Sequence, residues 1–320
     1  MNASTAAPPA PRAASPTRSR VRPLYWSVCR ELWENRSIYI APLAVAGVVL
    51  IGFMASAIGL PERRRVVLQL DIAQQRSAIG VPYDIAAIIL ILATVIVGVF
   101  YCLDALHGER RDRSILFWKS LPVSDLITVA AKAIVPMAVL PLLGFVIILA
   151  TQLGMLLVTD VTLLAHGMGI TTFAQVPLFA ESPVLLYGLV TLSLWHAPVY
   201  GWLLMVSAWA QRATFLWPVL PPLLIAVAER LAFNTGYVGS ILKSRLGGGF
   251  VHAFDLAPHS AAAARAIPGA HAAPPFLAEV ANAAPDPAKF VSTPEVWIGL
   301  VVAAGFIAAA VWLRRYRDPM

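Results

Sequence analysis

The residues best suited to recognition lie in one short, densely charged stretch between two long apolar runs. Glu109 is followed there by Arg110, Arg111, Asp112 and Arg113. Glu109 precedes Arg113 by four residues, which is the favourable order for an ion pair on a helix. Mixed charges of this kind suit an exposed helix that presents a recognition surface. They suit equally well a solvated turn whose charges only set membrane topology.

An apolar block follows these charges and predicts the end of the exposed helix. Pro122 cannot continue a helix, and Ser124 can cap the next one with Asp125 in its first turn. The sequence therefore predicts a helical hairpin outside the bilayer. The residues between the charges and the proline include Ser114, Ile115, Leu116, Phe117 and Trp118.

Three other residues that could have a functional role lie within apolar runs. Glu229 and Arg230 are adjacent near one end of a run, where an interfacial position is the simpler interpretation and a gate is the alternative. His196 is more often a packed, hydrogen-bonded residue than a proton carrier in such a place. No serine, cysteine or acidic partner for it can be identified from the sequence.

Motifs for catalysis within this chain are missing. The sequence contains no Gly-x-x-x-x-Gly-Lys-Ser/Thr, no His-Glu-x-x-His, no Gly-x-Ser-x-Gly and no metal-spaced set of Cys and His. We therefore expect no catalytic residue, no metal site and no directly bound cofactor. The scarcity of ionisable groups inside the apolar runs also argues against proton-coupled or sodium-coupled transport.

The elements that must position these residues are membrane helices. Of the 320 residues, 59% are hydrophobic and only 13% are charged, and the mean hydropathy is +0.74. A spanning helix needs about 20 apolar residues. Six runs meet this length, which predicts an all-α, polytopic integral membrane protein with six transmembrane helices. The runs are 38–60, 85–103, 133–158, 184–209, 215–233 and 296–313.

The distribution of positive charge predicts the orientation. With six spans, the segments on the side of the two termini carry 15 Lys and Arg, and the opposite segments carry 8, with Arg230 at a margin. The positive-inside rule then puts both termini in the cytoplasm. Arg63, Arg64 and Arg65 conflict with this rule, because they would lie just outside the first span. We attribute the net charge of +7 mostly to this excess of Lys and Arg in the cytoplasmic segments, and we expect no nucleic-acid partner.

The N-terminal region divides into two parts. Residues 1–22 are rich in Pro, Ala, Ser and Arg, which predicts a disordered cytoplasmic tail. Residues 23–37 have apolar side chains near helical spacing, which predicts an amphipathic helix in the inner headgroup layer. The alternative is that this segment simply begins the first span. The residues expected at the interface are Trp26, Arg30, Glu31 and Trp33.

The rest of the chain divides by its loops. Residues 38–233 hold the first five spans, with the charged loop at 104–132. Residues 234–295 form a long loop on the far side that could contain short helices. Residues 296–320 form the sixth span and a basic cytoplasmic end.

The charged loop resembles a known family. Residues 101–125, YCLDALHGERRDRSILFWKSLPVSD, resemble the first cytoplasmic loop of bacterial ATP-binding-cassette exporter permeases of the type-2 class. The segment Arg30-Glu31-Leu32-Trp33 and the six-span layout extend the resemblance over residues 24–233 and the last span. The loop is the more specific part, because the hydropathy layout alone is common to many membrane proteins.

The resemblance implies partners. It implies a subunit in the bacterial inner membrane that pairs with a second permease copy and with two ATP-binding subunits, which hold ATP and Mg²⁺. Glu109 to Trp118 would dock on the ATPase as a coupling helix, with Phe117 and Trp118 filling a pocket. Short outer helices would lie at 237–256, with Glu229 and Arg230 at an outer gate. The Ala-Pro tract at 257–287 departs from this pattern.

Three other interpretations remain open at this stage. An ATP-independent secondary transporter or channel would need buried charges or an internal repeat. An intramembrane enzyme would need paired catalytic groups at matching depth. A membrane anchor or assembly protein without transport needs neither.

Overall fold

The chain folds into long helices with short connections. The structure is a computed structural model, and it describes residues 21–112, 114, 123–169, 172, 176, 178–255 and 284–316. Its elements are α1 (Val21–Glu34), α2 (Ser37–Ala57), α3 (Leu60–Val67), α4 (Ile72–Ala105), α5 (His107–Arg111), α7 (Asp125–Ile134), the π-helix η1 (Val135–Val139), α8 (Leu140–Ala165), α10 (Leu178–Trp209), α11 (Leu216–Phe233), α12 (Tyr237–Gly247), α13 (Gly249–Ala253), β1 (Phe254–Asp255), β2 (Ala284–Pro285), α16 (Pro287–Ser292) and α17 (Pro294–Tyr316).

Six helices are long and apolar enough to cross a membrane, and they coincide with the six predicted runs. They are α2, α4, the continuous α7–η1–α8 rod, α10, α11 and α17. The all-helical, six-helix part of the prediction is therefore confirmed for the described residues. Of the predicted tail, residues 1–20 lie outside the described residues, and 21–22 already belong to α1.

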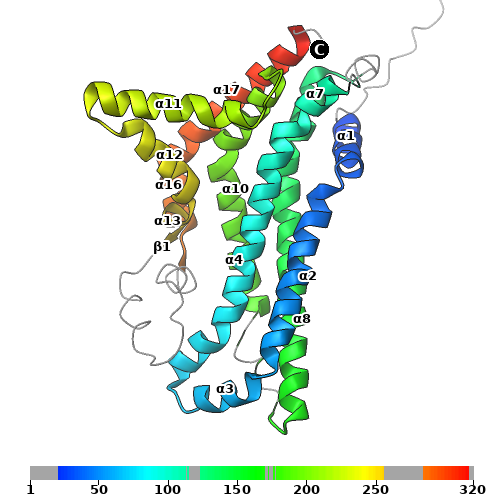
Figure 1. Cartoon of the computed structure of the whole chain (residues 1–320), viewed down its shortest axis with the longest axis vertical. Coiled ribbons are helices and arrows are strands. Elements are labelled where there is room, and N and C mark those ends of the chain that lie inside the picture. Colours follow the sequence, from blue (N-terminus) through cyan, green and yellow to red (C-terminus); the bar gives the residue numbers. More distant parts are fainter. Residues whose placement is uncertain are drawn as a thin grey trace, which may run out of the picture.

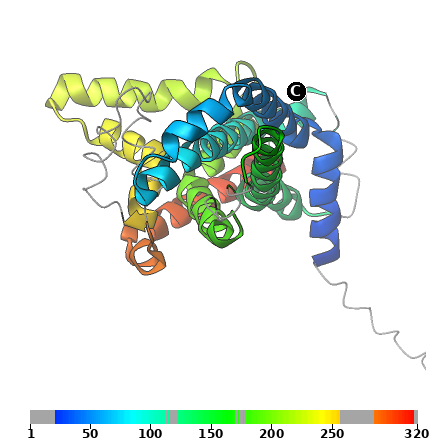
Figure 2. The same ribbon diagram turned by 90° about the horizontal axis from the view of Figure 1, so that it is seen from below.

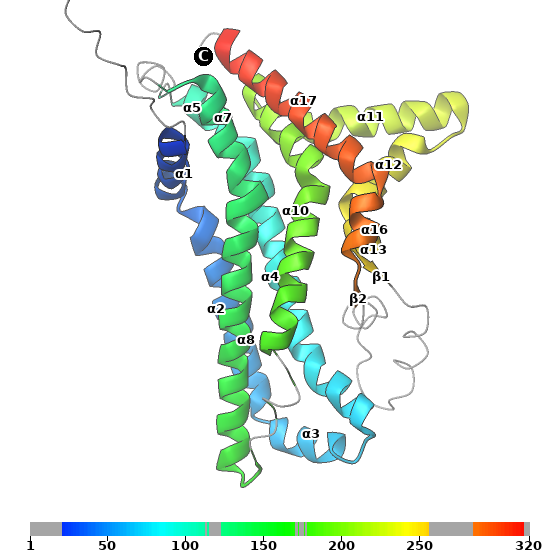
Figure 3. The same cartoon turned by 180° about the vertical axis from the view of Figure 1, so that it is seen from behind.

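Helices α2, α4, α8 and α10 run alongside one another and form the body of the molecule (Figure 1). Seen from below, their ends cluster together while α1 lies at the edge (Figure 2). Helix α17 crosses α10 diagonally and packs along it (Figure 3). The close approach of Gly201 in α10 to the backbone of Ala303 in α17, 3.1 Å from a Cβ placed there, shows how small residues allow this packing.

Helix α11 differs from the other five. It projects sideways from the bundle in both side views (Figures 1 and 3), and it packs on α12 and on one end of α10. Most of its apolar side chains, such as Leu224 and Leu231, are exposed. Its length and composition suit a membrane, and its surface in this chain meets few protein neighbours.

Helix α1 is a separate helix. The helical hydrogen bonding stops between Glu34 and Ser37, and the Asn35 Nδ2 atom donates to the Glu31 carbonyl at 3.1 Å. Helices α1 and α2 then run in different directions (Figure 3). The alternative of one continuous helix from residue 23 into the first span is wrong.

Two prolines explain a local change in the α7–η1–α8 rod. Pro136 lies in the π-helical turn η1, and Pro141 begins α8. Pro141 has no N–H to donate to the Met137 carbonyl four residues before it. The Ser193 hydroxyl of α10 donates to that carbonyl at 2.5 Å. A neighbouring helix thus satisfies the backbone group that the proline leaves open.

The segment between α11 and α17 contains short helices, as the resemblance implied for 237–256. Helices α12 and α13 lead into the two-residue strand β1, which pairs with β2 ahead of α16. Phe254 and Phe290 pack with Trp195 of α10 in one apolar cluster. Most of the Ala-Pro tract, 257–283, lies outside the described residues.

Candidate functional site

Six charged side chains from four helices meet at one end of the bundle. We call them the charge cluster. They come from α1, α5, α7 and α17, and every one of them takes part in an ion pair within the cluster. The members are Arg30 and Glu31 of α1, Glu109 of α5, Asp125 and Lys132 of α7, and Arg314 of α17.

Lys132 lies at the centre of the charge cluster. Its Nζ atom donates to both carboxylate oxygens of Glu31, each at 2.9 Å, and lies 3.1 Å from Oε1 of Glu109. The Tyr101 hydroxyl of α4 also donates to Oε2 of Glu31, at 2.9 Å. Lys132 is 2% exposed and Glu31 is 1% exposed. Buried charges of this kind are tolerated only when they are paired and hydrogen-bonded, and here both conditions hold.

Glu109 connects this centre to the last helix. One of its oxygens faces Lys132 and the Nη2 atom of Arg30, which lies 3.3 Å away, and the other accepts from Arg314. The Arg314 Nε atom also donates to Asp125 at 3.0 Å. Three carboxylates therefore face three cations within the charge cluster. Arg30 also pairs with the more exposed Glu34 of α1 at 3.5 Å, so every cation of the cluster has a counter-charge within the chain.

The local structure explains how Glu109 reaches this position. Helix α4 ends at Ala105 and α5 begins at His107, and Ser207 of α10 stabilises the break between them. Its hydroxyl accepts from the backbone N–H groups of Leu106 and His107, at 3.1 and 3.0 Å, and donates to the Leu103 carbonyl at 2.8 Å. One hydroxyl thus satisfies backbone groups that the end of a helix leaves unpaired.

Arg110 and Ser124 fix the two sides of the charged loop. Arg110 is buried, and its Nη1 atom donates to the Ala208 carbonyl at the end of α10, at 2.5 Å. The Ser124 side chain accepts from the Ile127 N–H, which is the predicted cap of the next helix. Asp125 follows it in the first turn, where a carboxylate is favourable.

The charge cluster connects the helices that meet at this end of the bundle. Removing a fully buried member such as Lys132 would leave a buried carboxylate short of its counter-charge, at a cost of about 3–5 kcal/mol. The helices α1, α5, α7 and α17 are thereby tied together at this end. Among the described residues, no group of three or more His, Cys, Asp or Glu side chains could hold a metal ion.

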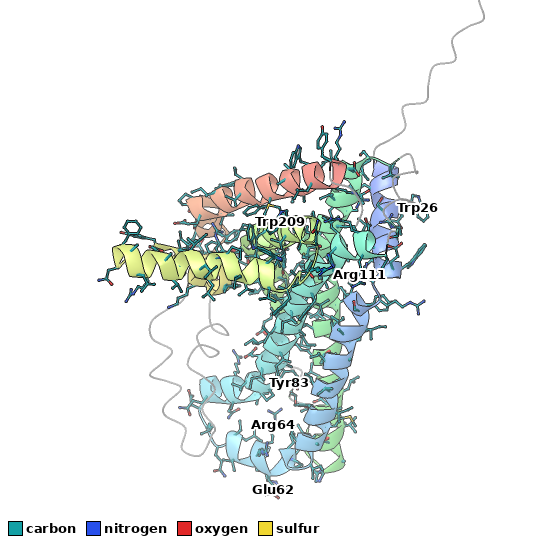
Figure 4. All side chains as sticks on the ribbon, turned by 45° about the horizontal axis from the view of Figure 1, so that its top comes forward. Trp26, Glu62, Arg64, Tyr83, Arg111 and Trp209 are labelled. Carbon is teal, nitrogen blue, oxygen red and sulfur yellow. The ribbon has the colours of Figure 1, made fainter. Side chains whose placement is uncertain are left out.

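The structure changes the interpretation of the α1 residues. Trp26 and Trp33 are exposed, and Trp26 points away from the bundle (Figure 4). Glu31 was expected on a polar face at the interface, and it is buried against Lys132 instead. The physical reason is that this face of α1 packs on α7, so the carboxylate meets a lysine and not water.

The predicted docking residues separate into three groups. Glu109 and Arg110 are buried in contacts within the chain, so their side chains do not lie on its surface. Arg111 and Asp112 are exposed, with side chains 61% and 63% accessible, and Ser114 is half-buried. The remaining predicted residues, Arg113, Leu116, Phe117 and Trp118, lie outside the described residues.

Glu229 and Arg230 do not pair with each other. Glu229 accepts from the Thr235 hydroxyl and from the backbone N–H groups of Tyr237 and Val238, at 2.8, 2.6 and 2.8 Å. It therefore closes the turn between α11 and α12 and caps the start of α12. These contacts give Glu229 a structural role, and the gate stays a prediction.

His196 is buried in α10, where its Nδ1 atom lies 2.8 Å from the Leu192 carbonyl in the preceding turn. Its ring lies 6.3 Å from that of Tyr200, tilted by 38°. These contacts are those of the packed histidine that the sequence favoured.

Lys132, Arg314 and Asp125 were not singled out from the sequence as site residues. Lys132 was counted only as a topogenic charge at the end of the loop, and Arg314 as part of the basic end. One signal was present: Lys132 has several apolar residues on each side, and such a lysine must find a carboxylate. Nothing in the sequence indicates that Glu31 is that carboxylate, because 101 residues separate them.

Comparison with known proteins adds no family. No protein-family model, no curated protein and no solved structure matches this chain.

Proposed function

We propose that this chain is the membrane-spanning permease subunit of an ATP-binding-cassette exporter of the type-2 class. It would move an unidentified substrate across or out of a bacterial inner membrane when separate subunits hydrolyse ATP. ATP and Mg²⁺ would be held by those subunits, and a second permease copy would complete the complex. The observation that carries the proposal is that the charged loop begins at Glu109, which is ion-paired to α1, α7 and α17.

This connection supplies what a coupling element needs. Arg111 and Asp112 are exposed beside Glu109, where a partner could reach them. A displacement of α5 would act on α1 through Arg30 and on α17 through Arg314, because separating these buried pairs costs several kcal/mol. Partner movement would thus reach the first and the last helices together. The ATPase must bind the two conformations of the permease unequally for its cycle to drive such a change.

Orientation belongs to the same proposal. The start of α1, the exposed Arg111 and the end of α17 lie at one end of the molecule (Figures 1 and 4). The excess of Lys and Arg in the segments on this side favours the cytoplasm. Both termini and the loop would then lie on the side of the cell that contains ATP.

The docking surface can be tested with a double variant. We expect Arg111→Glu with Arg113→Glu to insert normally into the membrane and to abolish the ATP hydrolysis that the permease stimulates in the complex. Arg315→Glu is the matched control, because Arg315 is also exposed at this end and outside the loop. Normal stimulation in the double variant would refute the docking assignment.

The partner can be tested by affinity purification of the tagged chain in mild detergent. A copurifying ATP-binding-cassette ATPase supports the exporter. Recovery of the intact chain without any ATPase favours the alternative, an ATP-independent secondary transporter or a non-transporting membrane anchor or assembly protein.

Orientation can be tested with Asp112→Cys in a background where Cys29 and Cys102 are replaced by alanine. Asp112 is exposed, so a thiol there is accessible from its own side. We expect a membrane-impermeant maleimide to label it only after the cells are opened. Labelling in intact cells would put the loop outside and remove the basis for ATPase contact.

A further inference from the structure

A second polar region lies at the end of the bundle opposite the charge cluster, where α2, α3, α4 and α8 surround a cavity of about 150 Å³. We call it the arginine pocket. The volume counts the space that the centre of a water-sized sphere can reach, and about 10–15 Å³ of it holds one water molecule. This cavity therefore has room for an anion the size of a lipid headgroup. The lining residues that matter here are Phe53, Leu60, Arg63, Arg64, Tyr83 and Thr159.

Arg64 is the buried cation of the arginine pocket. Its residue is 6% exposed, and its Nη2 atom donates to the Thr172 hydroxyl at 2.5 Å. Its Nε atom is buried and has no hydrogen-bond partner among the described residues. Within the same part of the chain, no carboxylate lies within ion-pair distance of Arg64 or Arg63. A buried guanidinium left in this state is costly unless an anion reaches it.

The charges around Arg64 leave this region positive. Burial lowers the pKa of Arg64, while Tyr83 and Asp160 oppose that shift. Arginine stays charged in proteins even so. Among the described residues, the lining of the arginine pocket includes the guanidinium groups of Arg63 and Arg64 and no Asp or Glu side chain, so the wall of the cavity is positive.

The remaining walls indicate the shape of the ligand. Next to Arg64, the Tyr83 hydroxyl lies 3.1 Å from that of Thr159, and these groups offer further polar contacts. Phe53 and Leu60 give the cavity apolar sides. Figure 4 places Arg64 on the side of α3 that faces Tyr83, with Glu62 on the opposite side. Polar contacts at one place and apolar walls beside them suit an acidic group attached to an acyl chain.

We propose that the arginine pocket binds the phosphate or carboxylate group of an anionic amphiphile, with Arg64 as the primary contact and Arg63 as the second. Arg64 would contact the anion through its guanidinium group, and the chain of the amphiphile would follow the apolar wall. This site also gives Arg63 and Arg64 a role on the side of the membrane where the sequence predicted few positive charges. The proposal does not depend on the exporter assignment.

The sequence provides a matched control within the same helix. Arg65 follows Arg64 directly, but its side chain is 63% exposed and lies 3.8 Å from Glu62 on the outer side of α3. Arg64→Gln and Arg65→Gln therefore remove the same charge one residue apart. Arg63→Gln is the second test variant, because Arg63 is exposed and its replacement does not disturb the packed interior.

The experiment is native mass spectrometry of the full-length protein in detergent, titrated with phosphatidylglycerol. We expect Arg64→Gln to weaken binding by about tenfold or more, the effect of losing a charge-assisted hydrogen bond. Arg63→Gln should weaken it less, and Arg65→Gln should bind like the original protein. Zwitterionic phosphatidylcholine should bind weakly to all variants.

Inorganic phosphate identifies the source of the anion. If it competes with phosphatidylglycerol, the free anion suffices, and if it does not, the acyl chain is required; both results support an anion site. Equal phosphatidylglycerol binding by Arg64→Gln and Arg65→Gln, with unchanged thermal stability, would overturn the proposal. If Arg64→Gln does not fold, equal binding by Arg63→Gln and Arg65→Gln overturns it instead.

Discussion

The two ends of the bundle solve the problem of buried charge in different ways. At one end, Lys132 and Arg314 face Glu31, Glu109 and Asp125, and each buried cation has a carboxylate within 3.1 Å. At the other end, in the part of the chain that the structure describes, Arg64 donates to the neutral Thr172 hydroxyl and its Nε atom has no hydrogen-bond partner.

This difference indicates what a group of buried charges does in the protein. A balanced cluster has its counter-charges within the chain, so its function is to hold helices together. A buried cation without a carboxylate partner, next to a cavity, can bind an anion that is not part of the chain. Loss of a residue should therefore reduce stability at the first end and reduce binding at the second.

The largest expected effect comes from Lys132→Met. This change leaves the Glu31 carboxylate buried with Arg30 as its remaining cationic partner, and we expect it to lower the free energy of unfolding by about 3–5 kcal/mol. The measurement is thermal unfolding of the detergent-solubilised protein, in which size-exclusion chromatography gives the fraction that stays folded after each temperature step. Lys243→Met is the control, because Lys243 is exposed on α12.

A double variant sharpens this prediction. Adding Glu31→Gln to Lys132→Met removes the stranded carboxylate, so stability should recover in part. If Lys132→Met unfolds at the same temperature as Lys243→Met, the charge cluster does not hold the helices together.

A smaller decrease in the free energy of unfolding is expected from Asp125→Asn. Asp125 is partly exposed, with 27% of its side chain accessible, and Arg314 keeps Glu109 as a second partner. We expect a cost of about 1 kcal/mol in the same unfolding assay. In a background that carries Arg314→Gln, the added effect of Asp125→Asn should nearly vanish. A full additive loss there would show that Asp125 stabilises the protein by some route other than Arg314.

The hydrogen bond between the uncharged Ser193 hydroxyl of α10 and the α7–η1–α8 rod should contribute still less to the free energy of unfolding. Ser193→Ala leaves the Met137 carbonyl without the hydroxyl that donates to it, and such bonds between membrane helices average about 0.6 kcal/mol. Ser182→Ala is the control, because the Ser182 hydroxyl is exposed and bonds within its own helix. The melting temperatures of the two variants should differ by a small but reproducible amount. Identical melting temperatures would mean that the Met137 carbonyl does not need the hydrogen bond from Ser193.

The sequence predicts well what depends on composition over a window. Six apolar runs became six long helices because any backbone in lipid must satisfy its own hydrogen bonds. Ser124 became the predicted cap, since capping acts over a few residues. Local rules are sufficient for features of this kind.

Contacts between distant segments could not be predicted. Helical spacing alone pointed Glu109 towards Arg113, whereas in the fold its carboxylate meets Lys132 and Arg314, the latter 205 residues away. Glu31 was placed on a polar face for the same reason. Amphipathic spacing shows that a face is polar, and only tertiary packing decides whether water or a counter-charge covers it.

The smallest expected effect on stability is that of Arg64→Met, and it completes the contrast with Lys132→Met. The change loses one hydrogen bond to Thr172, and it also removes a buried cation that has no carboxylate among the described residues to pair with. These two consequences oppose each other, so the free energy of unfolding should stay within about 1 kcal/mol of its original value, or rise. Thermal unfolding in lipid-free detergent measures it, with Arg65→Met as the control. A loss as large as that of Lys132→Met would mean that Arg64 is paired within the chain after all, and the arginine pocket would then have no spare charge to offer a ligand.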